Sequence, residues 1–134
     1  MSATLIDTNV LLDISTSDPD WSDWSISQLD QAALKGDLVI NDIVYAEFSV
    51  GFTNIEALDI AIRRARVVLK PIPRAALFMA GKAYRRYRAA GGPRTAILPD
   101  FLIGAHAAVT GMSLLTRDKG RYGSYFPTVA LVTP

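Results

Sequence analysis

Short, mostly apolar runs alternate with segments of helical hydrophobic spacing along the whole chain, and this alternation constrains the fold more than any other feature. The runs read as strands and lie at residues 3–6, 38–40, 113–116 and 129–132. The segments with helical spacing lie at residues 9–14, 21–35, 43–52, 55–69, 74–90 and 99–111. Strands separated by helices predict an α/β fold with a parallel sheet between helices, whose ligand crevice lies at the carboxyl ends of the strands.

Two local details complete this pattern. Asp20 precedes the helix predicted at residues 21–35 and is the expected N-cap. The stretch at residues 67–72 reads as extended, but Pro71 and Pro73 interrupt it. The pattern alone therefore leaves open whether this stretch joins the sheet.

Composition indicates one domain. A chain of 134 residues with 50% hydrophobic content can bury a sufficient core, and neither a linker nor a repeat divides it, so residues 1–134 are expected to form a single domain. The absence of cysteine excludes disulfides, zinc thiolate sites and cysteine nucleophiles. The first residues, MSATLIDTNVLLDIS, carry no basic leader and reach an acid after a short apolar run. We therefore expect neither a signal peptide nor a membrane span, and a cytoplasmic protein.

Acidic side chains stand where apolar segments meet turns or helices, and these acids are Asp7, Glu47, Asp100 and Asp118. Each has a structural alternative: Asp7 can cap a helix, Asp100 suits a first helical turn, Asp118 suits a turn, and the alternative for Glu47 is a solvated surface position. Acids at the ends of buried elements nevertheless carry a desolvation cost, which a shared divalent metal would offset. Together the four form a candidate site.

Helical spacing directs two of these acids toward the protein body. Glu47 shares its stripe with apolar residues, namely Ile43, Val44 and Val50. The face of Asp100 continues through small and apolar residues, namely Ile103, Gly104 and Ala107. We therefore expect both carboxylates to point inward, and a solvated role for Glu47 is not expected.

Charge is divided unevenly along the chain. Residues 1–59 hold 11 acids and one base, whereas residues 60–134 hold 13 bases and two acids. This division suggests a positive surface beside an acidic pocket, which would draw in a polyanion. Mutual neutralisation through surface pairs explains the same division.

The segments LIDTNVLLD, IVYAEF, LPDFLIGAHA and SLLTRD resemble successive motifs of the PIN-domain ribonucleases, particularly the VapC toxins of toxin–antitoxin operons. The resemblance extends from residue 3 to about residue 132. It implies a PIN-like three-layer α/β/α sandwich with a parallel, about five-stranded sheet, in which residues 67–72 supply the doubtful strand. It also implies a metal-dependent endoribonuclease of a type II toxin–antitoxin pair, an RNA substrate, a VapB-like antitoxin and a homodimer.

Residue by residue, the resemblance assigns metal binding and catalysis to Asp7, Glu47, Asp100 and Asp118, with Thr8, Asn9 and Thr116 as supporting polar residues. Oxygen ligands without cysteine or a histidine cluster favour Mg²⁺ or Mn²⁺. Some family members carry a further acid shortly after the last aspartate, where this chain has Lys119, Gly120 and Arg121. The sequence therefore does not decide whether the site binds one metal ion or two.

Other signals are weaker. Arginines for RNA contact are Arg85, Arg86, Arg88 and Arg94, beside Lys82, with Tyr84 and Tyr87 between them for stacking on bases. A solvated helix face explains this segment equally well. Trp21 and Trp24 are expected to be packed. His106 lies off the helical face of Asp100, which favours packing over metal ligation.

Two other classes of function fit less well. A receiver or haloacid-dehalogenase-like domain shares the alternation and the acidic crevice, but it requires adjacent acids or a second aspartate two residues after the first, and Asp7 is followed by Thr8 and Asn9. A catalytically silent PIN-like module that binds RNA or protein would be marked by loss of acids, and all four are present.

Overall fold

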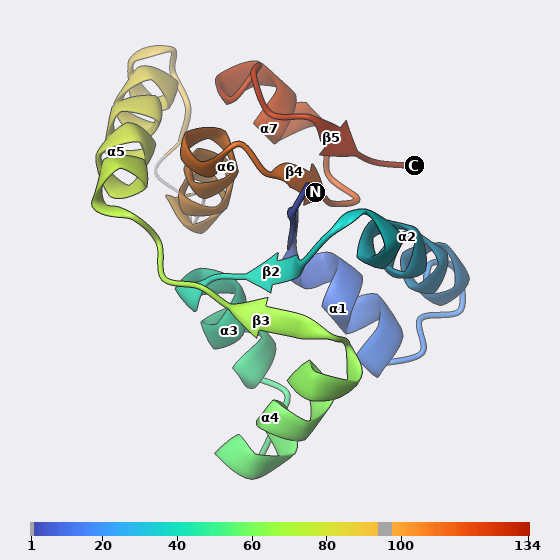
Figure 1. Cartoon of the computed structure of the whole chain (residues 1–134). Coiled ribbons are helices and arrows are strands. Elements are labelled where there is room, and N and C mark those ends of the chain that lie inside the picture. Colours follow the sequence, from blue (N-terminus) through green and yellow to red (C-terminus); the bar gives the residue numbers. More distant parts are fainter. Residues whose placement is uncertain (1, 94–97) are drawn as a thin grey trace.

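A five-stranded, wholly parallel sheet forms the centre of the molecule (Figure 1). The computed structural model describes residues 2–93 and 98–134. The strand order is β3-β2-β1-β4-β5, so the first strand of the chain lies in the middle. The strands are β1 (Thr4–Ile6), β2 (Leu38–Ile40), β3 (Val67–Leu69), β4 (Ser113–Leu115) and β5 (Leu131–Val132).

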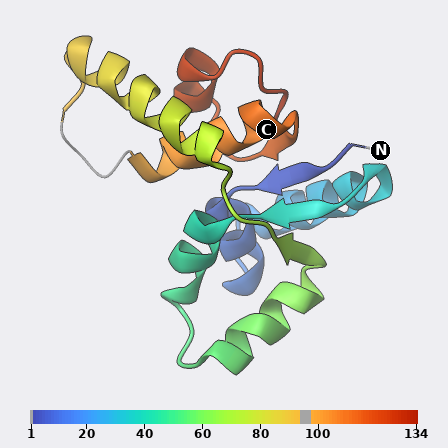
Figure 2. The same ribbon diagram turned by 60° about the vertical axis from the view of Figure 1, so that its left-hand side comes forward.

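Helices cover both faces of the sheet and give a three-layer α/β/α sandwich. They are α1 (Thr8–Ser15), α2 (Ser22–Lys35), α3 (Asp42–Ser49), α4 (Ile55–Arg64), α5 (Arg74–Ala89), α6 (Leu98–Thr110) and α7 (Gly120–Tyr125). Figures 1 and 2 show α5, α6 and α7 together on one side, and α1 and α4 on the other. The predicted fold class is confirmed, and residues 67–69 do form a strand.

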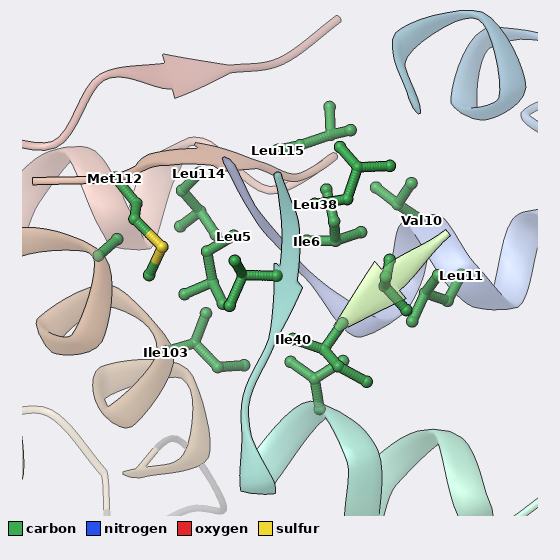
Figure 3. Close-up of a cluster of buried hydrophobic side chains, with 14 of the residues drawn as sticks. Leu5, Ile6, Val10, Leu11, Leu38, Ile40, Ile103, Met112, Leu114 and Leu115 are labelled. Carbon is green, nitrogen blue, oxygen red and sulfur yellow. The ribbon is translucent and has the colours of Figure 1, made fainter. Parts of the chain in front are cut away.

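The core lies on the three inner strands. Leu5, Ile6, Ile40, Leu114 and Leu115 are fully buried, and Figure 3 shows these side chains gathered around the strands, with Ile103 of α6 beside them. Each such side chain contributes about 1.5–3 kcal/mol through burial. These central strands are apolar on both faces because helices cover both faces. The sheet is thus a rigid base for the side chains at its edge.

Several boundaries differ from the sequence prediction. Helix α2 begins at Ser22, and Asp18 rather than Asp20 accepts the backbone N–H groups at this turn, at 2.9 Å. The predicted helix at residues 43–52 ends at Ser49. The predicted helix at residues 55–69 ends at Arg64, because Arg66 adopts a φ of 63° that turns the chain into β3.

A helix that the apolar pattern did not indicate follows the last candidate acid. Residues 120–125 form α7, although GRYGSY has two glycines and no amphipathic repeat. None of the helices in the described ranges is both long and apolar enough to cross a membrane.

Candidate active site

Asp7 lies at the carboxyl end of the central strand and is almost fully buried, with 6% of its surface exposed. It is the N-cap of α1, since its Oδ1 accepts the backbone N–H of Thr8 at 2.7 Å. Its Oδ2 accepts the hydroxyl groups of Thr116 at 2.7 Å and of Tyr122 at 3.2 Å. Asp7 therefore both caps α1 and belongs to the candidate site.

Burial makes the charge on Asp7 costly. Desolvation is the main cause that raises the pKa of this carboxyl from 3.8 to about 6; the hydrogen bond from Thr116 opposes the rise, and the negative charge of Asp100 adds to it. The donors to Asp7 in the described part of the chain are all neutral. A cation beside this group would therefore stabilise its charged form.

Glu47 is placed differently from the prediction. Its side chain is exposed, and the buried stripe of α3 consists of Val44 and Phe48. Val50 lies after the end of the helix and is 86% exposed, so it does not extend that stripe. The expected inward position of Glu47 was wrong. The carboxylate instead accepts the hydroxyl of Thr8 at 2.6 Å, which holds it against the start of α1.

Asp100 and Asp118 approach from the other elements. Asp100 is half-buried in the first turn of α6, and the helical face that it continues is buried. Its charge raises the pKa of Asp7. Asp118 is exposed after β4, and its backbone N–H donates to Thr116 Oγ1 at 3.0 Å.

All four acids line one hollow of about 320 Å³, together with Thr8, Asn9 and Leu12. Thr116 lies behind it, where its hydroxyl donates to Asp7 and accepts from Asp118. Asn9 points its amide nitrogen toward Asp7 Oδ2 at 3.4 Å and accepts the backbone N–H of Arg117 at 3.3 Å. Acids distant in sequence thus meet at the carboxyl edge of a parallel sheet.

Comparison with known proteins identifies the fold family. A family model for the PIN domain matches residues 4–123. The chain belongs to the PIN domain family. PIN domains are generally metal-dependent, and those of VapC toxins are generally nucleases. Membership excludes the receiver and haloacid-dehalogenase alternatives. Comparison with curated protein sequences gave no match.

Solved structures similar to this PIN domain come from toxin–antitoxin complexes. VapBC2 from Rickettsia felis, bound to a DNA fragment from its promoter, matches with a TM-score of 0.76 and 19% identity over 98% of both chains. VapBC-1 from nontypeable Haemophilus influenzae matches with a TM-score of 0.72 and 19% identity over 98% of this chain and 97% of the other. FitAcB from Neisseria gonorrhoeae matches with a TM-score of 0.68 and 20% identity over 98% and 97%. At these identities the likeness supports the fold.

The donors of this PIN domain suit a hard divalent cation. Carboxylate, hydroxyl and amide oxygens line the hollow, and Mg²⁺ and Mn²⁺ prefer such ligands. Among the residues that the structure describes, no three Asp, Glu or His side chains lie close enough together to hold a metal ion as they stand. Glu47 and Asp118 line the hollow from its exposed rim, whereas Asp7 is buried and Asp100 is half-buried.

Two features of the PIN domain were missed from the sequence. Tyr122 is fully buried and donates to Asp7, but it lies in a segment without helical periodicity. Asp13, 2% exposed, accepts the guanidinium of Arg117 at 2.8 and 2.9 Å and the hydroxyl of Ser25 at 2.8 Å. The Arg117 guanidinium also lies 5.1 Å from the ring centroid of Trp21. An acid inside the apolar run of α1 was the available signal.

The basic segment of α5 is only partly as predicted. Arg85 and Arg86 are exposed, whereas the guanidinium of Arg88 donates to the carbonyl of Gly92 at 2.7 Å and so closes the end of its own helix. Arg94 lies outside the described residues. Tyr84 and Tyr87 are half-buried and pack against Phe101 at centroid distances of 6.1 and 5.6 Å. Their rings belong to an internal cluster, which disfavours stacking on bases.

The remaining aromatic and histidine predictions concern packing. Trp21 and Trp24 are half-buried and meet edge to face at 6.0 Å. His106 is buried, and its Nδ1 lies 3.2 Å from the amide nitrogen of Asn41, whose oxygen caps α3. Burial lowers the pKa of His106. The imidazole is therefore part of the packing beneath α3.

Proposed function

We propose that this PIN domain is a metal-dependent endoribonuclease that acts as the VapC-like toxin of a toxin–antitoxin pair. The observation that carries the proposal is the hollow in which Asp7, Glu47, Asp100 and Asp118 meet at the carboxyl edge of the sheet. Membership of the PIN family adds the expectation of metal dependence. The cytoplasmic location expected from the sequence stays a prediction.

The residues in and behind the hollow have different expected roles. Asp7 and Asp100 are the inner acids that would hold Mg²⁺ or Mn²⁺, and Glu47 and Asp118 would complete the site from the rim. When bound, the cation offsets the clustered negative charge and polarises a phosphodiester. Thr8 orients Glu47 through its hydroxyl. Thr116 links Asp7 to the backbone of Asp118, so the two acids share one anchor.

RNA would be drawn to the exposed basic side chains of α5. Arg85 and Arg86 face solvent and are available for phosphate contacts. Arg88 has a structural contact as well, and Lys82 lies 5.1 Å from the ring centroid of Phe78. Arg94 completes the expected RNA-binding set. Contacts of this kind hold a backbone without selecting a sequence.

An antitoxin segment would occupy the apolar groove beside the hollow. This groove has a volume of about 650 Å³ and is lined by residues of α1, α2, α3 and α4, including Leu12, Ile26, Phe48 and Ile60. Leu12 also lines the acidic hollow, so the two spaces adjoin. The similar solved structures are VapBC complexes. A VapB-like peptide with apolar residues and a basic side chain aimed at the acids fits both spaces.

A homodimer is the expected assembly from the family resemblance. Leu77 and Phe78 of α5 are 46% and 68% exposed and form an apolar patch. A second copy would remove this patch from water. The molar mass of the purified protein by light scattering, compared between the parent and Phe78→Ser, measures this assembly.

Incubation of the purified protein with total RNA tests the nuclease. Cleavage is expected with Mg²⁺ or Mn²⁺ and is expected to stop in excess chelator. Asp37→Asn is a matched control, because Asp37 is exposed before β2 at the opposite edge of the sheet. Undiminished cleavage in chelator would refute the metal mechanism. No cleavage with either metal, by folded protein, would favour a catalytically silent PIN-like module.

Expression without an antitoxin tests the toxin role. The intact chain is expected to arrest growth, and Asp7→Asn is expected to relieve the arrest at equal protein level. Normal growth at a high level of intact, nuclease-active protein would mean that the protein is a nuclease but not a toxin.

A further inference from the structure

We propose that Tyr122 is a positioning residue for the Asp7 carboxylate, and that its buried hydroxyl fixes which oxygen faces the acidic hollow. This role deepens the proposed function, because it matters only if Asp7 binds a cation. Tyr122 does not line the hollow, so its effect on a bound ion would pass through Asp7.

The tyrosine is held rigidly. Only 1% of its surface is exposed, and it is the largest fully buried side chain in the described residues. Its hydroxyl donates to Asp7 Oδ2 at 3.2 Å. A tyrosine hydroxyl keeps its proton at neutral pH, and a carboxylate oxygen only accepts, so the hydroxyl is the donor in this contact. A donor on a packed ring cannot follow the carboxylate if the carboxylate turns.

The hydrogen bonds of Asp7 are divided unequally between its two oxygens. A carboxylate oxygen has two lone pairs. Oδ2 accepts the hydroxyl groups of both Thr116 and Tyr122, whereas Oδ1, within the described part of the chain, accepts only the backbone N–H of Thr8. Asn9 adds a longer contact to Oδ2 at 3.4 Å. Oδ1 is therefore the oxygen with capacity left for a cation, and Asp7 is set up to offer one oxygen rather than two.

Thr116 makes the shorter of the two contacts to Oδ2, at 2.7 Å against 3.2 Å, but it does not hold the carboxylate from the side of α7. Its oxygen also accepts the backbone N–H of Asp118 at 3.0 Å, so it is tied to the exposed loop after β4. Tyr122 contacts Oδ2 from α7, which packs against α6. With the tyrosine hydroxyl removed, the carboxylate gains freedom to turn both oxygens toward the hollow.

The choice between one and two oxygens affects metal selectivity. Mg²⁺ requires near-ideal octahedral coordination, whereas Ca²⁺ accepts bidentate carboxylates and more ligands. A carboxylate fixed to one oxygen favours the smaller ion. Loss of the Tyr122 hydroxyl should therefore weaken Mg²⁺ and Mn²⁺ binding while reducing the discrimination against Ca²⁺.

Tyr122→Phe tests this role, because it removes the hydroxyl and keeps the ring. Calorimetry with Mn²⁺ alone, and displacement by Mg²⁺ or Ca²⁺, would measure affinity without reference to cleavage. We expect Mn²⁺ to bind about tenfold more weakly, as for other groups that orient a metal ligand, and the ratio of Mg²⁺ to Ca²⁺ affinity to fall. The KM for RNA at saturating metal should change little.

Tyr125→Phe is the matched control. It removes a hydroxyl from the same helix, on a half-buried ring packed 5.1 Å from Phe101. Thr116→Val, which removes the other donor to Oδ2, should weaken Mn²⁺ binding as well. If Tyr122→Phe binds each ion like the parent while the parent still cleaves RNA, the positioning role is refuted and the proposed function stands. If the parent binds neither Mn²⁺ nor Mg²⁺, both are refuted.

Discussion

Two buried acids, one at the N-cap of α1 and one in its last turn, differ in what neutralises them. Asp13 is 2% exposed and receives two hydrogen bonds from the cationic Arg117 and one from Ser25. Asp7 is 6% exposed and receives neutral donors, and its pKa is raised to about 6. The first arrangement is complete within the protein and stabilises the fold. The second leaves a charge that a diffusible cation can stabilise, which is the condition for a metal site.

Asp7→Asn should show the largest contrast between activity and stability. Under the proposed mechanism, cleavage should fall by orders of magnitude, because a metal ligand is lost. Folding should be retained, since Asn is an equally good N-cap and a buried charge is removed. RNA cleavage and the midpoint of denaturant unfolding, measured on the same preparation, check both parts. An unfolded Asp7→Asn would show that the carboxylate is as structural as Asp13.

Arg117→Ala should reduce stability, whereas Asp7→Asn should retain it. It leaves Asp13 buried without its cation and removes the contact with Trp21, so we expect the free energy of unfolding to fall by about 3 kcal/mol. Asp30→Ala is the control, because it breaks the exposed ion pair with Arg66 at 2.6 Å and should cost less than about 1 kcal/mol. Urea unfolding of the three proteins measures these differences. Equal small losses in both variants would mean that Asp13 does not depend on Arg117.

Local patterns in the sequence predicted more of the fold than of the site. Apolar spacing predicted the order of strands and helices because burial on a sheet or helix face repeats over a few residues. It also predicted that acids would meet at the carboxyl edge, since parallel strands place their ends together. It did not predict that α3 ends at Ser49, before Val50, or that the buried stripe of α3 runs through Val44 and Phe48 and leaves Glu47 exposed. Helix ends depend on tertiary packing as well as on propensity.

The missed residues share one cause. Arg117 and Asp13 are 104 residues apart, and Tyr122 and Asp7 are 115 residues apart. No local period records such a contact. The sequence offered only an acid within an apolar run and a tyrosine before a glycine, and both patterns fit many environments. Contacts of this kind appear only when β1, β4 and α7 are assembled.

The stability of the metal-free protein should depend on pH through Asp7. The pKa of Asp7 is raised from 3.8 to about 6, so the folded state binds a proton more tightly than the unfolded state. Relative to Asp7→Asn, the parent should therefore gain stability as the pH falls through about 6 toward 3.8, and lose it as the pH rises. The gain should be about 2–3 kcal/mol. Urea unfolding in chelator across this range, as the difference between parent and variant, measures it.

A difference between parent and Asp7→Asn that does not change with pH would contradict the raised pKa of Asp7. With saturating Mg²⁺, the dependence should shift to lower pH, because the cation favours the charged carboxylate. The same pH titration with Mg²⁺ is thus a second test, which shows whether a cation binds beside Asp7.

Substitution of the arginines on α5 should give the smallest effect. The structure indicates that these arginines do not contribute equally to RNA binding. Arg85 and Arg86 are exposed, whereas Arg88 already donates to Gly92. If the first two contact RNA phosphates, the double variant Arg85→Gln/Arg86→Gln should lower the slope of log affinity against log salt by about 1.4, since each contact to a single strand contributes about 0.7. Arg88→Gln should change the slope less and lower thermal stability slightly, through loss of the helix-end contact. Salt titration of RNA binding by the Asp7→Asn protein, with and without these changes, avoids cleavage during the measurement. Identical slopes in all the proteins would assign the arginines of α5 to a solvated surface and would mean that other basic residues contact the RNA phosphates.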